Sequence, residues 1–246
     1  MIGLPSRGPS AKTGSELGQL LLPLFGQGRD DYFCREIVSG NIPDCCRNLV
    51  PITVEAGGNT LQYFVSGDVL SVGSNEDYLR ISLNGKSAKK LFDTFDLLLP
   101  TKKMCDDIWR LADLKLEPRP MGASPNMMMT SVLVGHNTAI NQQLAGREFK
   151  LLTGHKKDTV LAKHLLEDRS RCAIYGWFHL NGQPIQDLQT IRHDVFYQDY
   201  SQSIRIVSRS ATLNDQPIDL FDLINNPQYT YLVNEEVAYD PTTIYT

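Results

Sequence analysis

The sequence predicts an α+β fold in which N-terminal helices precede a mostly antiparallel sheet. Two observations support this prediction. Helix caps and amphipathic spacing dominate the first half of the chain, whereas short apolar runs bounded by turn residues dominate the second. The chain has 246 residues, 41% of them hydrophobic, which is enough to bury a core of ordinary size. We expect a flexible arm over residues 1–14 and a single compact α+β domain over residues 15–246.

Three short helices are expected near the N-terminus. Ser15 can cap a helix over 16–22, which Pro23 ends because proline cannot continue the backbone hydrogen bonding. Further helices are predicted over 30–38 and 43–49, the latter starting with a proline, which suits a first turn.

Two consecutive amphipathic helices form the strongest local prediction, one capped by Ser87 and the next by Thr101. Their apolar side chains recur at helical spacing and define one buried face on each. These side chains are Ala88, Leu91, Phe92 and Phe95 in the first helix, and Met104, Cys105, Ile108, Trp109 and Ala112 in the second.

Strands are predicted mostly after this helical part, with one hairpin before it. Residues 52–55 and 61–65 flank a glycine-rich turn, and Asn181-Gly182 predicts a second hairpin. Residues 118–125 are expected to be a loop. The other predicted elements are strands over 78–83, 127–134 (a core strand), 149–152, 159–161, 171–177 and 204–207, and helices over 138–144 and 219–224.

Charge and hydropathy exclude some classes of partner. The net charge of −4 provides no global basic field for nucleic acid, and no apolar run reaches the length of a membrane span. The lysines Lys86, Lys89, Lys90, Lys102 and Lys103 are most simply solvated helix faces, with a phosphate or carboxylate contact as the alternative. The oligomeric state is left open.

The five cysteines form no CxxC pair, and their number is odd. Reduced, partly buried thiols are therefore the default, and a secreted protein with one or two disulfides is the alternative. The compartment stays open between a cytoplasmic protein and a secreted one whose signal segment is absent from this chain.

All five histidines lie between residues 136 and 193, and imidazole is the side chain most easily poised near neutral pH. The segment 154–158 is expected to lie in a loop between strands. There His155 and Asp158 can act as a base and its orienting carboxylate, while Lys156 and Lys157 supply positive charge for a substrate carboxylate or an oxyanion. An exposed, charged turn without function is the alternative.

A second candidate group contains His193, Asp199 and Ser201, with Arg205 close behind in the sequence. An alcohol, a base and an acid are what nucleophilic acyl transfer requires. However, Ser201 does not lie in a Gly-x-Ser-x-Gly turn, so general-base catalysis on water by His193 or Asp199 is the preferred interpretation.

Metal binding and stacking on a substrate are further alternatives in the same region. The histidines and aspartates contain enough ligand atoms for zinc, but no known zinc spacing occurs, so no cofactor is predicted. Tyr175, Trp177, Tyr197 and Tyr200 can stack on sugars or peptide planes, or can be core aromatics.

Several short segments, taken in order between about Asp30 and Arg205, resemble a family of uncharacterised bacterial proteins. These segments are Leu99-Pro100-Thr101-Lys102-Lys103-Met104, His136-Asn137, Gly154-His155-Lys156-Lys157-Asp158, Tyr175-Gly176-Trp177, Pro184-Ile185-Gln186 and Asp199-Tyr200-Ser201. The resemblance implies one shared domain and one constellation that joins Lys102, Lys103, His136, Lys157, Asp158, His193 and Asp199. Phe178 and Gln202 stand at the two positions where the family pattern has histidine, which weakens the case for a metal site.

We therefore expect a hydrolase that acts on a peptide or glycan polymer of the bacterial envelope, such as peptidoglycan or another polysaccharide. His155, Asp158, His193, Asp199 and Ser201 are its candidate catalytic residues. The candidate substrate-binding residues are Lys103, His136, Lys157, Tyr175, Trp177, Tyr200 and Arg205. A non-catalytic glycan- or peptide-binding domain and a structural protein with surface histidines are the alternatives.

Overall fold

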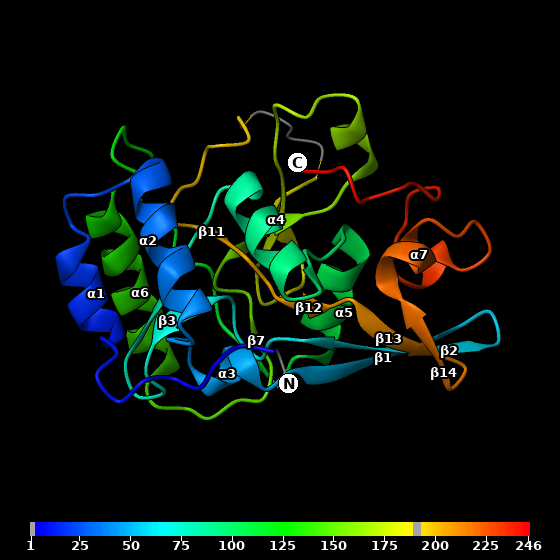
Figure 1. Ribbon diagram of the computed structural model, residues 1–246, viewed down its shortest axis with the longest axis horizontal. Helices are drawn as coiled ribbons and strands as arrows, with labels where there is room; N and C mark the ends of the chain where they lie inside the picture. Colours follow the sequence, from blue (N-terminus) through cyan, green and yellow to red (C-terminus); the bar gives the residue numbers. More distant parts are fainter. Residues whose placement is uncertain (1–2, 189–192) are drawn as a thin grey trace.

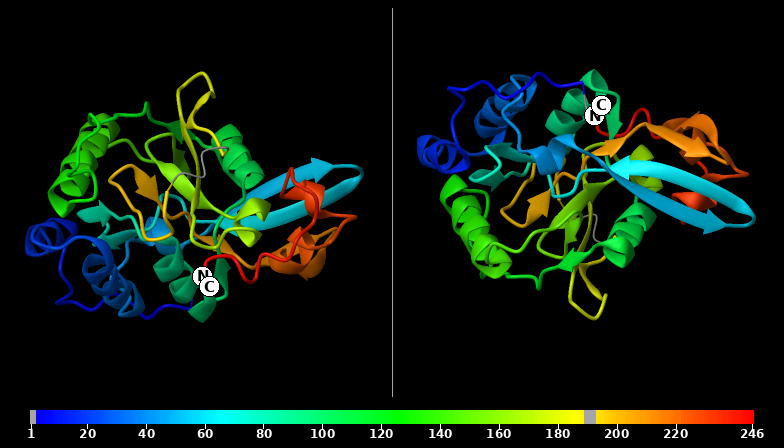
Figure 2. Two further views of the ribbon diagram at one scale, coloured as in Figure 1. Left: turned by 90° about the horizontal axis from the view of Figure 1, so that it is seen from above. Right: turned by 90° about the horizontal axis from the view of Figure 1, so that it is seen from below.

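The computed structural model describes residues 3–188 and 193–246 and confirms the α+β class. The views in Figures 1 and 2 place α1, α2 and α6 together at one end of the molecule. A long hairpin, β1–β2, projects at the opposite end beside β13, β14 and α7. The strands β8, β9 and β11 lie between these two ends (Figure 2).

The helices begin at residues that satisfy their free backbone N–H groups. Thr13 accepts from the N–H of Glu16, Asn84 from that of Ser87, and Thr101 from that of Met104. The helices are α1 (Gly14–Leu20), α2 (Gly26–Val38), α3 (Asp44–Arg47), α4 (Gly85–Thr94), α5 (Lys102–Leu111), α6 (Thr130–Leu144) and α7 (Leu220–Ile224), with 3₁₀ turns at Lys163–Leu166 and Thr230–Leu232.

The larger sheet has the strand order β14-β13-β2-β12-β5, and β1 also pairs with β2. Every pairing in this sheet is antiparallel. Its strands are β1 (Val50–Ala56), β2 (Asn59–Val65), β5 (Leu97–Leu98), β12 (Val207–Ser208), β13 (Ser210–Leu213) and β14 (Gln216–Asp219). The hairpin predicted from the glycine-rich turn is therefore confirmed.

The smaller sheet, ordered β10-β9-β8-β11, carries four of the candidate site residues: Lys157, Asp158, Tyr175 and Trp177. Strand β8 pairs antiparallel with β9 and parallel with β11. The strands are β8 (Lys157–Val160), β9 (Ala173–Phe178), β10 (Pro184–Gln186) and β11 (Gln202–Ser203). Two small pairs complete the structure: β3 (Ser71–Gly73) with β4 (Tyr78–Arg80), and β6 (Leu114–Lys115) with β7 (Leu152–Thr153).

The predicted core strand over 127–134 is wrong, because this segment enters α6. Its buried positions, Thr130, Leu133, His136, Asn137 and Ile140, follow helical spacing and not the alternation of a strand. Three of these five side chains, Thr130, His136 and Asn137, are polar and have hydrogen-bond partners, so the apolar pattern does not reveal the first half of the helix.

Other differences concern the ends of elements. The strand predicted over 204–207 shortens to β12, because residues 204 and 206 instead accept single hydrogen bonds from Leu70 and Ser66. Lys157 and Asp158 belong to β8 and not to a loop. The N-terminal segment, predicted as an arm, makes specific contacts: Arg7 donates to the Asn41 side chain and Arg47 donates to the Leu4 carbonyl.

A large hydrophobic cluster runs from Leu17 of α1 through Tyr63 of β2 to Tyr245 near the C-terminus. It packs both sheets against the surrounding helices and so fixes the strands that carry the site. Among the described residues, no helix has the length and apolar character needed to cross a membrane.

Candidate functional site

Strand β8 separates two candidate residues that are adjacent in the sequence. Successive side chains of a strand point to opposite faces of the sheet, so Lys157 and Asp158 have different neighbours. The Lys157 ammonium lies 3.2 Å from the Asp199 carboxylate. The Asp158 carboxylate instead accepts the Ser203 hydroxyl at 2.9 Å and faces the thiol of Cys105.

The Lys157–Asp199 pair lies at the base of a polar cluster that we call the β8 site: Lys157, His193, Tyr197, Asp199 and Ser201. Oδ1 of Asp199 accepts the Ser201 backbone N–H and hydroxyl, and Oδ2 accepts the Tyr197 hydroxyl. Burial raises the pKa of Asp199, but Lys157 and the hydrogen bonds from Ser201 outweigh burial and leave it below the usual value. Asp199 is therefore held as a carboxylate.

His193 and Tyr197 are the partly exposed members of the β8 site, and His193 is the one that can act as a base. Its half-buried ring stacks on the ring of Tyr197, with centroids 4.2 Å apart and planes 7° apart. Burial and the nearby Lys157 charge lower the pKa of His193 below the usual value. The imidazole is therefore neutral at pH 7, which is the form that a general base requires.

Ser201 does not have the surroundings of a nucleophile. Its side chain is buried, and its hydroxyl donates to Asp199 at 2.6 Å. A serine nucleophile needs an imidazole or amine base within hydrogen-bond reach and an exposed oxygen. We conclude that Ser201 holds Asp199 in place, so its predicted catalytic role is not supported by the geometry.

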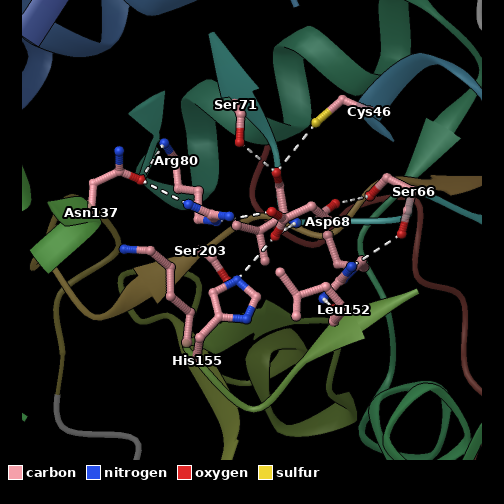
Figure 3. Close-up of polar contacts among 12 residues, drawn as sticks. Cys46, Ser66, Asp68, Ser71, Arg80, Asn137, Leu152, His155 and Ser203 are labelled. Atoms are coloured by element: carbon pink, nitrogen blue, oxygen red, sulfur yellow. Dashed lines mark hydrogen bonds and ion pairs between the residues drawn. The ribbon is translucent and has the colours of Figure 1, made fainter. Parts of the chain in front are cut away.

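The structure places His155 beside Asp68 and not beside Asp158, its predicted partner. His155 Nε2 lies 3.0 Å from Asp68, which in turn accepts from Arg80 at 2.9 Å, and all three side chains are almost completely buried (Figure 3). Arg80 also donates to Asn137 and Asn141 of α6. This cluster ties β4 to α6 and to the segment before β8, which is a structural role for His155.

Asp68 and Arg80 were not singled out from the sequence. Asp68 follows the end of β2 and Arg80 ends β4, and neither stands in a recognisable motif. Burial raises the pKa of Asp68, but Arg80 and His155 outweigh burial and lower it well below the usual range. Asp68 is therefore a buried anion compensated by the Arg80 cation.

Arg205, predicted to bind substrate charge, is buried and structural. Its guanidinium donates to the carbonyls of Ser66 and Leu152, each at 3.0 Å. Through these bonds Arg205 connects the segment after β2 to β7. Its two terminal guanidinium nitrogens therefore already have partners within the protein.

A separate interior group joins Lys156, His136, Tyr200 and Trp177. The Lys156 ammonium donates to the Tyr200 carbonyl and lies 3.4 Å from Nδ1 of His136. The His136 ring contacts Tyr200 and Trp177 edge-on, and Trp177 donates to the His155 carbonyl. Burial lowers the pKa of Lys156 to about 7, with Arg80 adding to the effect, and burial together with Lys156 lowers that of His136 to about 2.

The two remaining candidates, Lys103 and Tyr175, contact side chains of helix α5. Lys103 forms an ion pair with Asp107 one turn away. The Tyr175 hydroxyl donates to Asp106 at 2.8 Å, and Lys102 lies over the Tyr175 ring. Tyr175 therefore packs β9 against α5, and neither Lys103 nor Tyr175 joins the β8 site.

Within the part of the chain that the structure describes, no group of three or more His, Cys, Asp or Glu side chains has the geometry of a metal site. His193 has Lys157 as a close neighbour, and a cation there disfavours a second cation. All five cysteines, Cys34, Cys45, Cys46, Cys105 and Cys172, are free thiols.

Comparison of the chain with family models, curated proteins and solved structures finds no match. The resemblance to a family of uncharacterised bacterial proteins therefore stays a prediction.

Gly154 is a glycine that the candidate region requires. Its φ is +90°, and a Cβ atom would lie 2.3 Å from the Leu116 carbonyl oxygen. We expect Gly154→Ala to lower the free energy of unfolding by about 2–4 kcal/mol, from backbone strain and overpacking. Urea denaturation measures the loss. Gly122→Ala is the matched control, because a Cβ there meets nothing within 4 Å; an equal loss in both variants would contradict the steric argument.

Proposed function

We propose that the protein is a hydrolase that cleaves a peptide of the bacterial envelope at the β8 site. The observation that carries the proposal is His193, a half-buried imidazole with a lowered pKa, stacked on Tyr197 beside the Lys157–Asp199 pair. A neutral base next to a fixed cation is suited to activating water and stabilising an oxyanion.

In the proposed reaction, His193 takes a proton from water as the water oxygen bonds to the substrate carbonyl carbon. The Lys157 ammonium stabilises the negative charge on the carbonyl oxygen, and Asp199 and Tyr197 hold the geometry. When the carbonyl re-forms, the bond to the amine breaks and the amine takes the proton from His193. The water is thus divided between the two products.

A peptide is a better substrate for this site than a glycan. Glycoside hydrolysis commonly uses two carboxyl groups that flank one bond. Here Asp199 pairs with Lys157 on one face of β8, while Asp158 bonds to Ser203 on the other. The two candidate carboxylates therefore do not face a common glycosidic bond.

The second candidate function is a non-catalytic peptide- or glycan-binding domain. It is favoured by the low exposure of the Lys157 and Asp199 side chains, 8% and 2%. In such a domain His193 and Tyr197 would only contact the ligand.

The experiment compares His193→Ala with His179→Ala on a panel of envelope peptides, peptidoglycan and polysaccharides. His179 is an exposed histidine that contacts Glu117 away from the β8 site, so its variant is the control. We expect His193→Ala to lower kcat at least about 100-fold, the typical contribution of a general base, and His179→Ala to leave it unchanged.

The pH profile provides a second measurement. Because the pKa of His193 is lowered, its neutral form persists below the ordinary histidine pKa of about 6.5, and the acidic limb of kcat/KM should lie below that pH. Equal turnover in both variants would refute the hydrolase. Binding of panel members without any turnover would favour the second candidate.

A further inference from the structure

A groove runs between helices α2 and α4, which lie side by side (Figures 1 and 2). Its volume is about 550 Å³, within the range of small-ligand and peptide-side-chain sites. Apolar groups from both helices line it, among them Cys34, Val38 and Leu91. Val38 is 48% exposed, so part of this lining faces solvent.

Three cations surround the apolar lining: Arg35 of α2 and Lys86 and Lys90 of α4. Among the described residues, no ion pair joins any of these three to a carboxylate. Lys89 of the same helix differs, because it pairs with Asp93 at 2.5 Å and does not line the groove. One acid, Asp31, also lines the groove, and its carboxylate accepts from Gln27.

The groove is connected to the β8 site through one short segment of chain. Phe196 lines the groove, is 51% exposed and lies under the Lys86 ammonium, 5.8 Å from the ring centroid. The next residue, Tyr197, stacks on His193 and donates to Asp199. Consecutive Cα atoms are about 3.8 Å apart, so the groove and the β8 site are adjacent along this segment.

We propose that the α2–α4 groove is a substrate subsite that binds an acidic peptide segment bearing apolar side chains. This proposal rests on the proposed function and adds the substrate class. The carboxylates of such a segment would pair with Arg35, Lys86 and Lys90, and its apolar side chains would cover Val38 and Phe196. The protein carries a net charge of −4, so a local group of cations that have no carboxylate partner among the described residues is a selective feature for an anionic ligand.

The test measures binding by fluorescence anisotropy of a labelled peptide of alternating glutamate and leucine residues. His193→Ala serves as the parent protein, so that turnover does not consume the probe. We expect the double variant Lys86→Glu/Lys90→Glu to weaken binding at least about tenfold, since charge reversal replaces attraction by repulsion at two positions. Lys89→Glu, on the same helix but outside the groove, should change binding less than about twofold.

Two further probes examine the charge and the apolar contact separately. The peptide with glutamine in place of glutamate should bind at least about tenfold more weakly, and Phe196→Ala should weaken the acidic peptide about threefold or more. Equal binding of the two peptides, or an equal loss in Lys89→Glu and the double variant, would overturn the proposal.

Failure of the groove and failure of the hydrolase give different results. If His193→Ala abolishes turnover but the double variant binds the peptide normally, the hydrolase stands and the subsite is refuted. If His193→Ala turns over substrate normally, the hydrolase is refuted, whatever the groove binds. If the hydrolase and the subsite are both correct, the Lys86→Glu/Lys90→Glu double variant in the otherwise unchanged protein should raise KM with little change in kcat.

Discussion

Asp68→Asn is expected to lower the free energy of unfolding by about 3–5 kcal/mol, the cost of removing one partner from a buried ion pair. The Arg80 guanidinium would stay buried beside a neutral amide, and His155 would lose its carboxylate contact. Arg80 would keep its bonds to Asn137 and Asn141, which is why a partial loss is expected and not complete unfolding.

Urea denaturation with Asp93→Asn as the control measures this effect. Asp93, whose side chain is 49% exposed, pairs with Lys89 one helical turn away, and such pairs on a helix surface contribute about 0.5 kcal/mol or less. A loss in Asp68→Asn no larger than the loss in Asp93→Asn would show that the buried pair contributes little.

The pH dependence of the Asp68→Asn effect has a definite sign. The folded-state pKa of Asp68 lies well below its unfolded value of about 3.9, so the unfolded state binds the proton first as the pH falls. The stabilisation from the carboxylate is present above about pH 4 and is lost below it. The difference between wild type and Asp68→Asn should therefore shrink as the pH falls from about 4 to 2.

The fold could be predicted where local chemistry and hydrophobic spacing agree. The Thr101 cap, the amphipathic helix after it and the β1–β2 hairpin are all present. In these elements the residues that define the local structure also define the buried face, so one pattern gives both.

The second half of α6 is the helix predicted over 138–144, but its first half could not be predicted because the buried face there is partly polar. His136 and Asn137 are buried: Asn137 accepts from Arg80, and His136 lies against the Lys156 ammonium. A hydrophobic pattern assigns such residues to the surface, and the apolar run before them then looks like a strand. The partner residues come from β4 and from the segment before β8, which sequence spacing does not connect.

The candidate site likewise could be predicted only in part, because sequence spacing does not show which residues meet in space. Asp199 and His193 could be found because both are chemically versatile side chains in one short segment, and Lys157 because it lies in a charged cluster. The pairing could not be found, since the alternation of β8 decides that Lys157 and not Asp158 faces Asp199. Asp68 was missed because a single aspartate after a strand carries no distinguishing pattern.

Lys156→Met is expected to raise the free energy of unfolding by about 2 kcal/mol at pH 6. Burial lowers the pKa of Lys156 to about 7, whereas in the unfolded chain it is about 10.4. Protonated Lys156 therefore destabilises the folded state, because folding transfers an ammonium group from water into a site whose nearest partners are a carbonyl and a neutral imidazole. Methionine has a similar shape without the charge, and loss of the bond to the Tyr200 carbonyl offsets about 1 kcal/mol of the gain.

The sign of the pH dependence distinguishes this cause from a packing effect. Between about pH 7 and 10 the unfolded state binds more protons than the folded state, so the stability of the wild type relative to Lys156→Met increases with pH. The gap should be largest at pH 6 and should narrow as the pH approaches 10. Lys163→Met, at an exposed lysine, is the control and should stay within about 0.5 kcal/mol of wild type at every pH. A gap between wild type and Lys156→Met that does not vary with pH would mean that packing, and not the buried charge, sets the difference.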